Sequence, residues 1–446
     1  MSPGPRAKPV QREVVALVAD DAVLAPETDG VRRLPVIEDS DGWPSVRELQ
    51  TLVQAPRARL IGPPRRYDGD PVVTFHVLAQ PTGCSTDHDA VDWLPLDRIH
   101  GLTDDAAVLA DLTATLTEAD GTAPWPTHRP DWLRRGWLDE AEDWIDRQLA
   151  TLGRQRSAPS TVLQMWSLAT VLRTPVTSPS GEDAVVFKAS CDWFAAEPAI
   201  TRVVGTLGER CVPTVLAVDE PRGWMLMAEM TGVEGDAEDA AARLALALDV
   251  APHIARLQLA SLPRLDELKA AGLPDRGLTA TIEAFGRMLD DSLELPELDS
   301  TELDGLRRRE PWLREQLTSL YAAGIPVALT HGDLHLDNVA ADRHGPVAYD
   351  WSDASISHPF IDGFHLATRV REEDRAAVHA AYTAPWAEAF PEADVDGALR
   401  LARLADRIFE AISYEGIQLH QEAASRWELS GVTARILRDI GSMSLD

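Results

Sequence analysis

The spacing of apolar residues changes along this chain, and that change constrains the fold more than any other feature. From about residue 161 to residue 229, short apolar and β-branched runs indicate strands. From about residue 236 to the end, apolar residues recur mostly at helical spacing. The sequence therefore predicts a small antiparallel sheet lobe followed by a helical lobe, in the α+β fold class.

The predicted sheet lobe has a definite order of elements. Three antiparallel strands are followed by one helix and two further strands. In chain order we expect strands over 162–165, 170–176 and 184–189, a helix over 197–209, and strands over 215–218 and 224–229. This order is typical of a bilobal, protein-kinase-like architecture, although other α+β enzymes share it.

The length of 446 residues is too great for one ordinary domain. Residues 121–130 contain Pro124, Pro126 and Pro130, and such a run lies neither inside a helix nor in a central strand. The sequence predicts four parts in all. These are a small α+β N-terminal domain over 1–120, a linker and helix over 121–155, the sheet lobe over 156–230, and the helical lobe over 231–446.

The net charge of the chain disfavours some classes of binding partner. The chain has 42 Lys and Arg against 72 Asp and Glu, which gives a formal net charge of −30. Such a surface repels nucleic acid and anionic lipid and weakly favours a cationic small substrate. We therefore expect a small-molecule partner, no nucleic acid and no membrane.

The cysteines and the apolar segments point to a cytoplasmic protein. Cys84, Cys191 and Cys211 are widely spaced and form neither a disulfide framework nor a metal-ligand pair. The most apolar later stretch, residues 241–262, carries charges at Arg243 and Asp249 and is expected to form an amphipathic helix.

Residues 331–353, with the sequence HGDLHLDNVAADRHGPVAYDWSD, hold the strongest signal for chemistry. Phosphoryl transfer requires a carboxylate near the acceptor hydroxyl, oxygen ligands for Mg²⁺, and a cation on the nucleotide phosphates. Asp333 can supply the first, and Asn338 and Asp350 the second. Pairing of 339–341 with 347–349 as a hairpin would place Asn338 beside Asp350. Asp333 and Asn338 taken singly could be ordinary turn residues, but the combined pattern favours a site.

Lys188 is the candidate for the cation. It lies in the otherwise apolar strand 185–189, where a lysine needs a partner, and Glu197 at the start of the next helix can provide one. The alternative is a lysine that extends from an edge strand into solvent.

The pattern His-Gly-Asp-x-x-x-x-Asn followed by Asp-Trp resembles the aminoglycoside phosphotransferase and choline kinase branch of the protein-kinase-like fold. The resemblance covers about residues 155–430. It implies that Asp333 is the catalytic base, that Asn338 and Asp350 bind Mg²⁺, and that Lys188 and Glu197 hold the α- and β-phosphates.

The same resemblance identifies residues 225–230 as the hinge, where Met227 and Glu229 would contact the adenine of ATP. The sequence departs from the wider kinase pattern at residues 166–169, which contain no glycine to cradle phosphates.

Residues 13–120 resemble a degenerate Nudix domain. The resemblance rests on the strand order, on Arg47-Glu48-Leu49 and on residues 93–96. The positions of the two metal-binding glutamates are occupied by Thr51 and Leu52, so diphosphate hydrolysis is not expected. The alternative is an unrelated small cap domain.

Taken together, the sequence predicts a Mg²⁺- and ATP-dependent phosphotransferase that acts on a hydroxyl of an aminoglycoside, amino sugar or amino-alcohol. GTP as donor and the oligomeric state are left open. The alternatives are a kinase of peptide Ser or Thr in natural-product biosynthesis and a nucleotide-binding pseudokinase. Side chains that could meet a substrate ammonium are Glu234, Asp236, Asp353 and Glu415.

Overall fold

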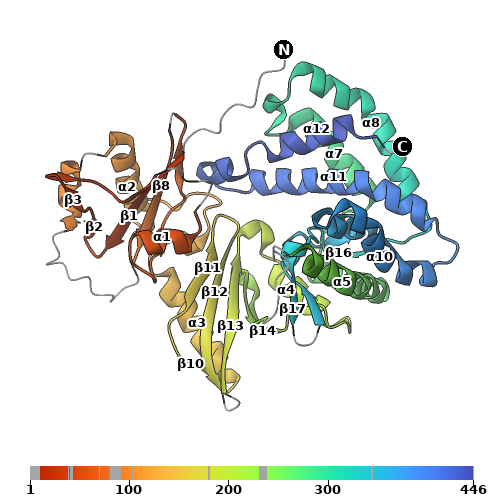
Figure 1. The fold of residues 1–446 in the computed structure, drawn as a ribbon, viewed down its shortest axis with the longest axis horizontal. Coiled ribbons are helices and arrows are strands. Elements are labelled where there is room, and N and C mark those ends of the chain that lie inside the picture. Colours follow the sequence, from red (N-terminus) through yellow and green to blue (C-terminus); the bar gives the residue numbers. More distant parts are fainter. Residues whose placement is uncertain are drawn as a thin grey trace. The chain divides into compact units, whose positions relative to one another are not determined.

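A computed structural model describes residues 11–38, 40, 44–69, 71–80, 92–102, 104–178, 181–230, 239–342 and 345–444 (Figure 1). The chain divides into two compact units. The first contains Met1–Asp192 and Gln421–Glu428, and the second contains Trp193–His420 and Leu429–Asp446. The four-part division expected from the sequence stays a prediction.

The first unit begins with a seven-stranded sheet of order β6-β8-β1-β2-β9, in which β5 also pairs with β1 and β7 with β8. Its strands are β1 (Gln11–Ala19), β2 (Ala22–Leu24), β5 (Val36–Ile37), β6 (Arg59–Leu60), β7 (Arg65–Tyr67), β8 (Val72–Ala79) and β9 (Trp93–Pro95), and a separate pair is formed by β3 (Glu27–Thr28) and β4 (Val31–Arg32). The central pair β1 and β8 is parallel. The chain turns between β1 and β2 at Asp20, which has a φ of 49°.

Two helices belong to this first sheet region. The helix α1 (Val46–Leu52) begins with a capping box, in which Ser45 and Glu48 satisfy each other's backbone N–H groups. The helix α2 (Ala106–Ala119) begins at Asp105, whose side chain accepts from the Ala107 N–H, and packs its apolar side chains into the core with β1 and β8. The extra N-terminal α+β region is confirmed, while its Nudix-like resemblance stays a prediction.

A second set of strands follows in the first unit. It comprises β10 (Gln155–Arg156), β11 (Thr161–Met165), β12 (Ala169–Ser178) and β13 (Gly181–Ser190). The central strand β12 pairs antiparallel with the other three, which confirms the three predicted antiparallel strands. The helix α3 (Trp137–Thr151) packs Trp137 and Trp144 against Phe187 of β13, with ring centroids 6.0 and 5.7 Å apart.

The second unit contains several short antiparallel strand pairs and most of the helices (Figure 1). The first of these pairs is the hairpin of β14 (Val215–Asp219) and β15 (Trp224–Ala228). The helices are α4 (Glu197–Val204), α5 (Ala240–Ser261), α6 (Leu265–Ala270), α7 (Leu278–Asp291), α8 (Ser300–Tyr321), α9 (Phe360–Leu366), α10 (Arg375–Ala389), α11 (Val395–Leu419) and α12 (Val432–Ser442). The predicted C-terminal end of α4 at residue 209 is wrong, because the helix stops before Gly205 and Gly208.

The core of the second unit forms around α11, which contacts α7, α8, α9 and α12. One apolar face of this helix is buried, at Leu401, Leu404, Ile408 and Phe409. Among the described residues, no helix is both long enough and apolar enough to cross a membrane.

Candidate active site

The polar stretch of residues 331–353 is held between two paired strands of the second unit. It leaves β16 (Ala328–Thr330) and returns to β19 (Ser355–Ser357), and these strands pair antiparallel with Thr330 opposite Ser355. Between them lies the predicted hairpin, formed by β17 (Val339–Asp342) and β18 (Gly345–Ala348) with Val339 opposite Ala348. The Tyr349 N–H donates to the Asn338 carbonyl at 2.9 Å, so the chain returns beside Asn338 just before Asp350.

Asp333 lies at the start of this stretch and is held from several sides. The Asn338 side-chain amide donates to the Asp333 carbonyl at 2.9 Å and to its Oδ2 at 3.0 Å. Two imidazoles face the carboxylate, with His335 Nε2 3.4 Å from Oδ2 and His365 Nε2 3.5 Å from Oδ1. The Asp333 side chain is nevertheless 40% exposed, so part of the carboxylate remains accessible.

The charge state of Asp333 follows from these contacts. Burial alone would raise the pKa of this carboxyl, but hydrogen bonds and charge from His335 and His365 outweigh burial and hold its pKa well below the usual range. Asp333 is therefore an ionised carboxylate at neutral pH, as a group that orients an acceptor hydroxyl must be.

Asn338 and Asp350 provide two hard oxygen donors. Because the Asn338 amide nitrogen is turned toward residue 333, its oxygen is on the opposite side of the planar amide group. Asp350 has a left-handed backbone, with φ 64° and ψ 65°, and its Oδ1 accepts from Ser352 Oγ at 2.7 Å. Aspartate tolerates this conformation better than most residues, and strained positions cluster at functional sites.

One amide and one carboxylate fit Mg²⁺, which takes few protein ligands and prefers oxygen. No group of three or more His, Cys, Asp or Glu side chains placed to hold a metal is found in the described part of the chain. A site built on Asn338 and Asp350 is smaller than such a group and is compatible with that finding.

Asp362 of α9, which the sequence did not single out, fixes the backbone before Asp333. Its carboxylate accepts from the N–H groups of His331 and Gly332 at 2.7 and 2.9 Å. Burial raises its pKa to about 7, although these two N–H groups oppose the shift. His331 Nε2 donates to the Tyr349 carbonyl at 2.9 Å, so this histidine links the two ends of the polar stretch.

Gly332 occupies a position that no other residue can adopt without strain. Its φ is 86°, and a Cβ added there would lie 2.4 Å from the Asp353 carbonyl oxygen and 2.9 Å from the Phe409 ring. We therefore expect Gly332→Ala to destabilise the protein by about 1–3 kcal/mol from backbone strain, with the clash in addition.

The measurement is the melting temperature by calorimetry, with Gly286→Ala as the matched control. Gly286 lies within α7, and an added Cβ meets no heavy atom within 4 Å. Alanine at this helix interior should keep or slightly raise the melting temperature. An unchanged melting temperature for Gly332→Ala would contradict the strain described here.

The other predicted site residues lie on the elements expected for them. Lys188 is on β13 in the first unit and is 7% exposed, so the alternative of a lysine extended into solvent is not what the structure shows. Glu197 is the first residue of α4 in the second unit and is 1% exposed. Met227 is buried on β15, and Glu229 follows that strand. The pairing of Lys188 with Glu197 stays a prediction.

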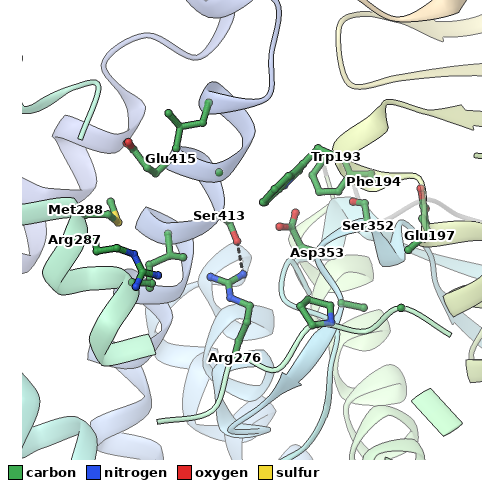
Figure 2. Close-up of a pocket in the computed structure, with 18 of the residues that line it drawn as sticks. Trp193, Phe194, Glu197, Arg276, Arg287, Met288, Ser352, Asp353, Ser413 and Glu415 are labelled. Carbon is green, nitrogen blue, oxygen red and sulfur yellow. Dashed lines mark hydrogen bonds between the residues drawn. The ribbon is translucent and has the colours of Figure 1, made fainter. Parts of the chain in front are cut away.

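A cavity of about 750 Å³ lies within the second unit beside this stretch (Figure 2). Its walls are largely apolar and include Trp193, Phe194, Ile200, Met288, Ile412 and Leu419. Ser352 and Asp353 also line it, and Ser352 is the residue whose hydroxyl contacts Asp350. The cavity is therefore next to the candidate metal ligand.

The charged groups that line the cavity differ in charge state and in the hydrogen bonds they already make. Burial raises the pKa of Asp353 to about 7, and the negative charge of Asp333 adds to this shift. Glu415 already accepts from Ser292 Oγ at 2.6 Å and from the Leu293 N–H at 3.1 Å. Arg276 donates to Ser413 Oγ at 2.7 Å, as Figure 2 shows. Of the four acidic residues proposed to meet an ammonium, Asp353 and Glu415 line the cavity, whereas Glu234 and Asp236 lie outside the described residues.

Comparison with known proteins identifies the family of this chain. The APH model, described as the phosphotransferase enzyme family, matches residues 168–395, which is more than half of the chain. No curated protein matches the sequence.

Several solved structures were found to be similar to this chain. The GDP complex of an aminoglycoside 2'-phosphotransferase is 18% identical, with a TM-score of 0.48, and the match covers 68% of this chain and 98% of that one. A macrolide 2'-phosphotransferase from Brachybacterium faecium is 14% identical, with a TM-score of 0.44 and coverage of 68% and 99%. A choline/ethanolamine kinase family protein from Mesorhizobium loti is 18% identical, with a TM-score of 0.43 and coverage of 68% and 89%.

The family match confirms the predicted family and, with the observed strands and helices, the predicted α+β, protein-kinase-like fold class. The chain therefore belongs to the APH phosphotransferase enzyme family and is a small-molecule phosphotransferase with an alcohol group as acceptor.

Proposed function

We propose that this protein transfers the γ-phosphoryl group of ATP, in the presence of Mg²⁺, to a hydroxyl of an amine-bearing small molecule. One observation carries the proposal. The ionised Asp333 is bound to Asn338 at the base of a hairpin that returns the chain to Asp350. A carboxylate for the hydroxyl and two oxygen ligands for a metal are what phosphoryl transfer asks of a protein.

In this proposal Asp333 accepts a hydrogen bond from the acceptor hydroxyl and orients it toward the γ-phosphorus. It takes the hydroxyl proton as the new P–O ester bond forms and the bond from the γ-phosphorus to the β–γ bridging oxygen breaks, with ADP as the leaving group. Asn338 and Asp350 would hold Mg²⁺, which when bound would offset the negative charge that develops on the phosphate oxygens. Asn338 would have two roles, since its amide oxygen would bind Mg²⁺ while its amide nitrogen holds the Asp333 carboxylate in place.

The remaining residues are proposed to bind the nucleotide. Lys188 would contact the α- and β-phosphates and Glu197 would fix its ammonium, while the backbone of Met227 and Glu229 would contact adenine. The Lys188 and Glu197 side chains are each buried, and a buried charge is costly unless it has a partner. ATP is the proposed donor, and GTP is its competitor in the same site.

The cavity beside Asp353 is proposed to bind the acceptor. Its apolar walls suit an amino-alcohol or amino sugar with a substantial apolar surface better than a fully polar polyamine. An ammonium group near Asp353 would favour the ionised carboxylate, which burial otherwise opposes.

The test is a screen for acceptor-stimulated ADP release with ATP and Mg²⁺. The panel should contain amino-alcohols, amino sugars, aminoglycosides and Ser- or Thr-containing peptides. We expect amine-bearing alcohols to stimulate release, whereas preferential stimulation by peptides would favour the peptide-kinase alternative. Nucleotide binding that is independent of Mg²⁺, with no stimulated release by any acceptor, would favour the pseudokinase.

A further inference from the structure

His365 connects Asp333 to the helical core of the second unit. It lies on α9 and is buried. Its Nδ1 donates to Asp406 Oδ1 at 2.7 Å, and its Nε2 lies 3.5 Å from Asp333 Oδ1. Asp406 belongs to α11 and is 1% exposed, so the imidazole is held between two carboxylates that are far apart in the sequence.

The groups around His365 favour a protonated ring. A carboxylate oxygen faces each ring nitrogen, and in the protonated ring both nitrogens are donors. Burial opposes the charge, but Asp406 and Asp333 outweigh it and raise the pKa of His365 well above its ordinary value. The carboxyls of Asp362 and Glu410 also lie near His365, and burial raises the pKa of each of them to about 7.

Asp406 is itself held in place, and a second imidazole lies close to His365. Arg407 contacts Asp406 Oδ2 at 3.1 Å and Glu410 at 2.6 Å. The His335 ring centroid is 5.8 Å from that of His365.

The two oxygens of Asp333 are restrained by different parts of the protein. Oδ2 contacts Asn338 and His335, which belong to the same local stretch. The Oδ1 contact comes from His365, and through it from Asp406. The torsion about the Cβ–Cγ bond of an aspartate has a broad energy well. With contacts to Oδ2 alone, the Asp333 carboxylate could therefore still rotate about this bond.

We propose that His365, fixed by Asp406, is a positioning residue that sets the orientation of the Asp333 carboxylate toward the acceptor hydroxyl. This inference rests on the role proposed for Asp333 in phosphoryl transfer. His365 touches no reacting atom in this scheme. Its effect should therefore appear in the rate of transfer rather than in the binding of ATP or acceptor.

The test compares His365→Leu with His365→Gln, whose side-chain amide can replace the donor that faces Asp333. We expect His365→Leu to lower kcat by about 10- to 100-fold with little change in the KM of ATP or acceptor, since small misplacements of a reacting group have effects of this size. His365→Gln should recover a large part of the loss. Asp406→Asn should lower kcat in the same direction, because it removes the charge that fixes the ring.

His379→Gln is the matched control. This histidine lies on α10 and stacks on Phe364, with ring centroids 6.0 Å apart, and it is not among the residues that hold Asp333. Its kcat should equal that of the wild type. Melting temperatures establish that each variant is folded. If His365→Leu does not fold, the kcat values of Asp406→Asn and His365→Gln test the positioning role of His365 instead.

Two results would overturn the inference while leaving the proposed function intact. One is a wild-type kcat in His365→Leu or Asp406→Asn when Asp333→Asn is inactive. The other is an equal loss of kcat in His365→Leu and His365→Gln, which would indicate a packing role. Wild-type activity in Asp333→Asn would instead overturn the proposed function itself.

Discussion

Asp333→Asn should lower kcat by roughly 10²- to 10⁴-fold, the effect expected when a general base is removed. The substitution keeps the size of the side chain but replaces the carboxylate that His335 and His365 hold in its ionised form. An amide cannot take the proton of the acceptor hydroxyl. The measurement is acceptor-dependent ADP release at saturating ATP, Mg²⁺ and acceptor.

The control for this variant is Asp249→Asn, which removes one negative charge from an exposed position on α5. It should release ADP at the wild-type rate. If Asp333→Asn retained more than about a tenth of the wild-type kcat, a value above the range for loss of a general base, Asp333 would not have the proposed role.

Asp350→Asn should raise the Mg²⁺ concentration needed for half-maximal activity by at least about 10- to 100-fold. Substitution of a residue that merely hydrogen-bonds to a metal ligand has effects of this size, and loss of the ligand's own charge should cost no less. Asparagine also tolerates the left-handed backbone seen at residue 350, so the substitution removes the charge with little added strain. Activity is measured against free Mg²⁺ at a fixed, saturating ATP concentration.

Recovery of activity at high Mg²⁺ is a second, independent readout for Asp350→Asn. If the metal site is correct, high Mg²⁺ should restore part of the lost activity, and Asp249→Asn should give the wild-type Mg²⁺ curve. A loss of kcat that no Mg²⁺ concentration relieves, with an unchanged half-maximal concentration, would argue against Asp350 as a metal ligand.

The parts of the site that the sequence predicted are local in the chain. The hairpin of β17 and β18 follows from two short apolar runs on either side of a turn, and its register brings Asn338 next to residue 349. The strands β11, β12 and β13 were predicted for the same reason, since their pairing joins neighbours in the sequence.

The parts that the sequence did not predict depend on contacts between distant segments. Asp362, His365 and Asp406 reach the site only because α9 and α11 pack against each other. Their types and spacings carry no local signal, and an aspartate inside a helix is usually solvated. The parallel pairing of β1 with β8 was missed likewise, because the apolar pattern of a strand does not identify its partner.

The sequence patterns also did not predict where two helices begin and end. The helix α4 was expected to continue to residue 209, but the chain turns at Gly205 and Gly208, the latter with a φ of 99°. The helix α3 begins only at Trp137, directly after Gly136, whose φ is 78°. In both cases a glycine inside an otherwise helical pattern ended or started the helix.

In the proposed reaction one phosphoryl group moves from ATP to an acceptor hydroxyl. This transfer can be followed by phosphorus NMR of the complete reaction, with the strongest acceptor from the screen, ATP and Mg²⁺. We expect a new phosphomonoester signal that grows in step with the β-phosphate signal of ADP and is absent with Asp333→Asn. Release of ADP accompanied by inorganic phosphate alone, with no phosphorylated acceptor, would contradict it.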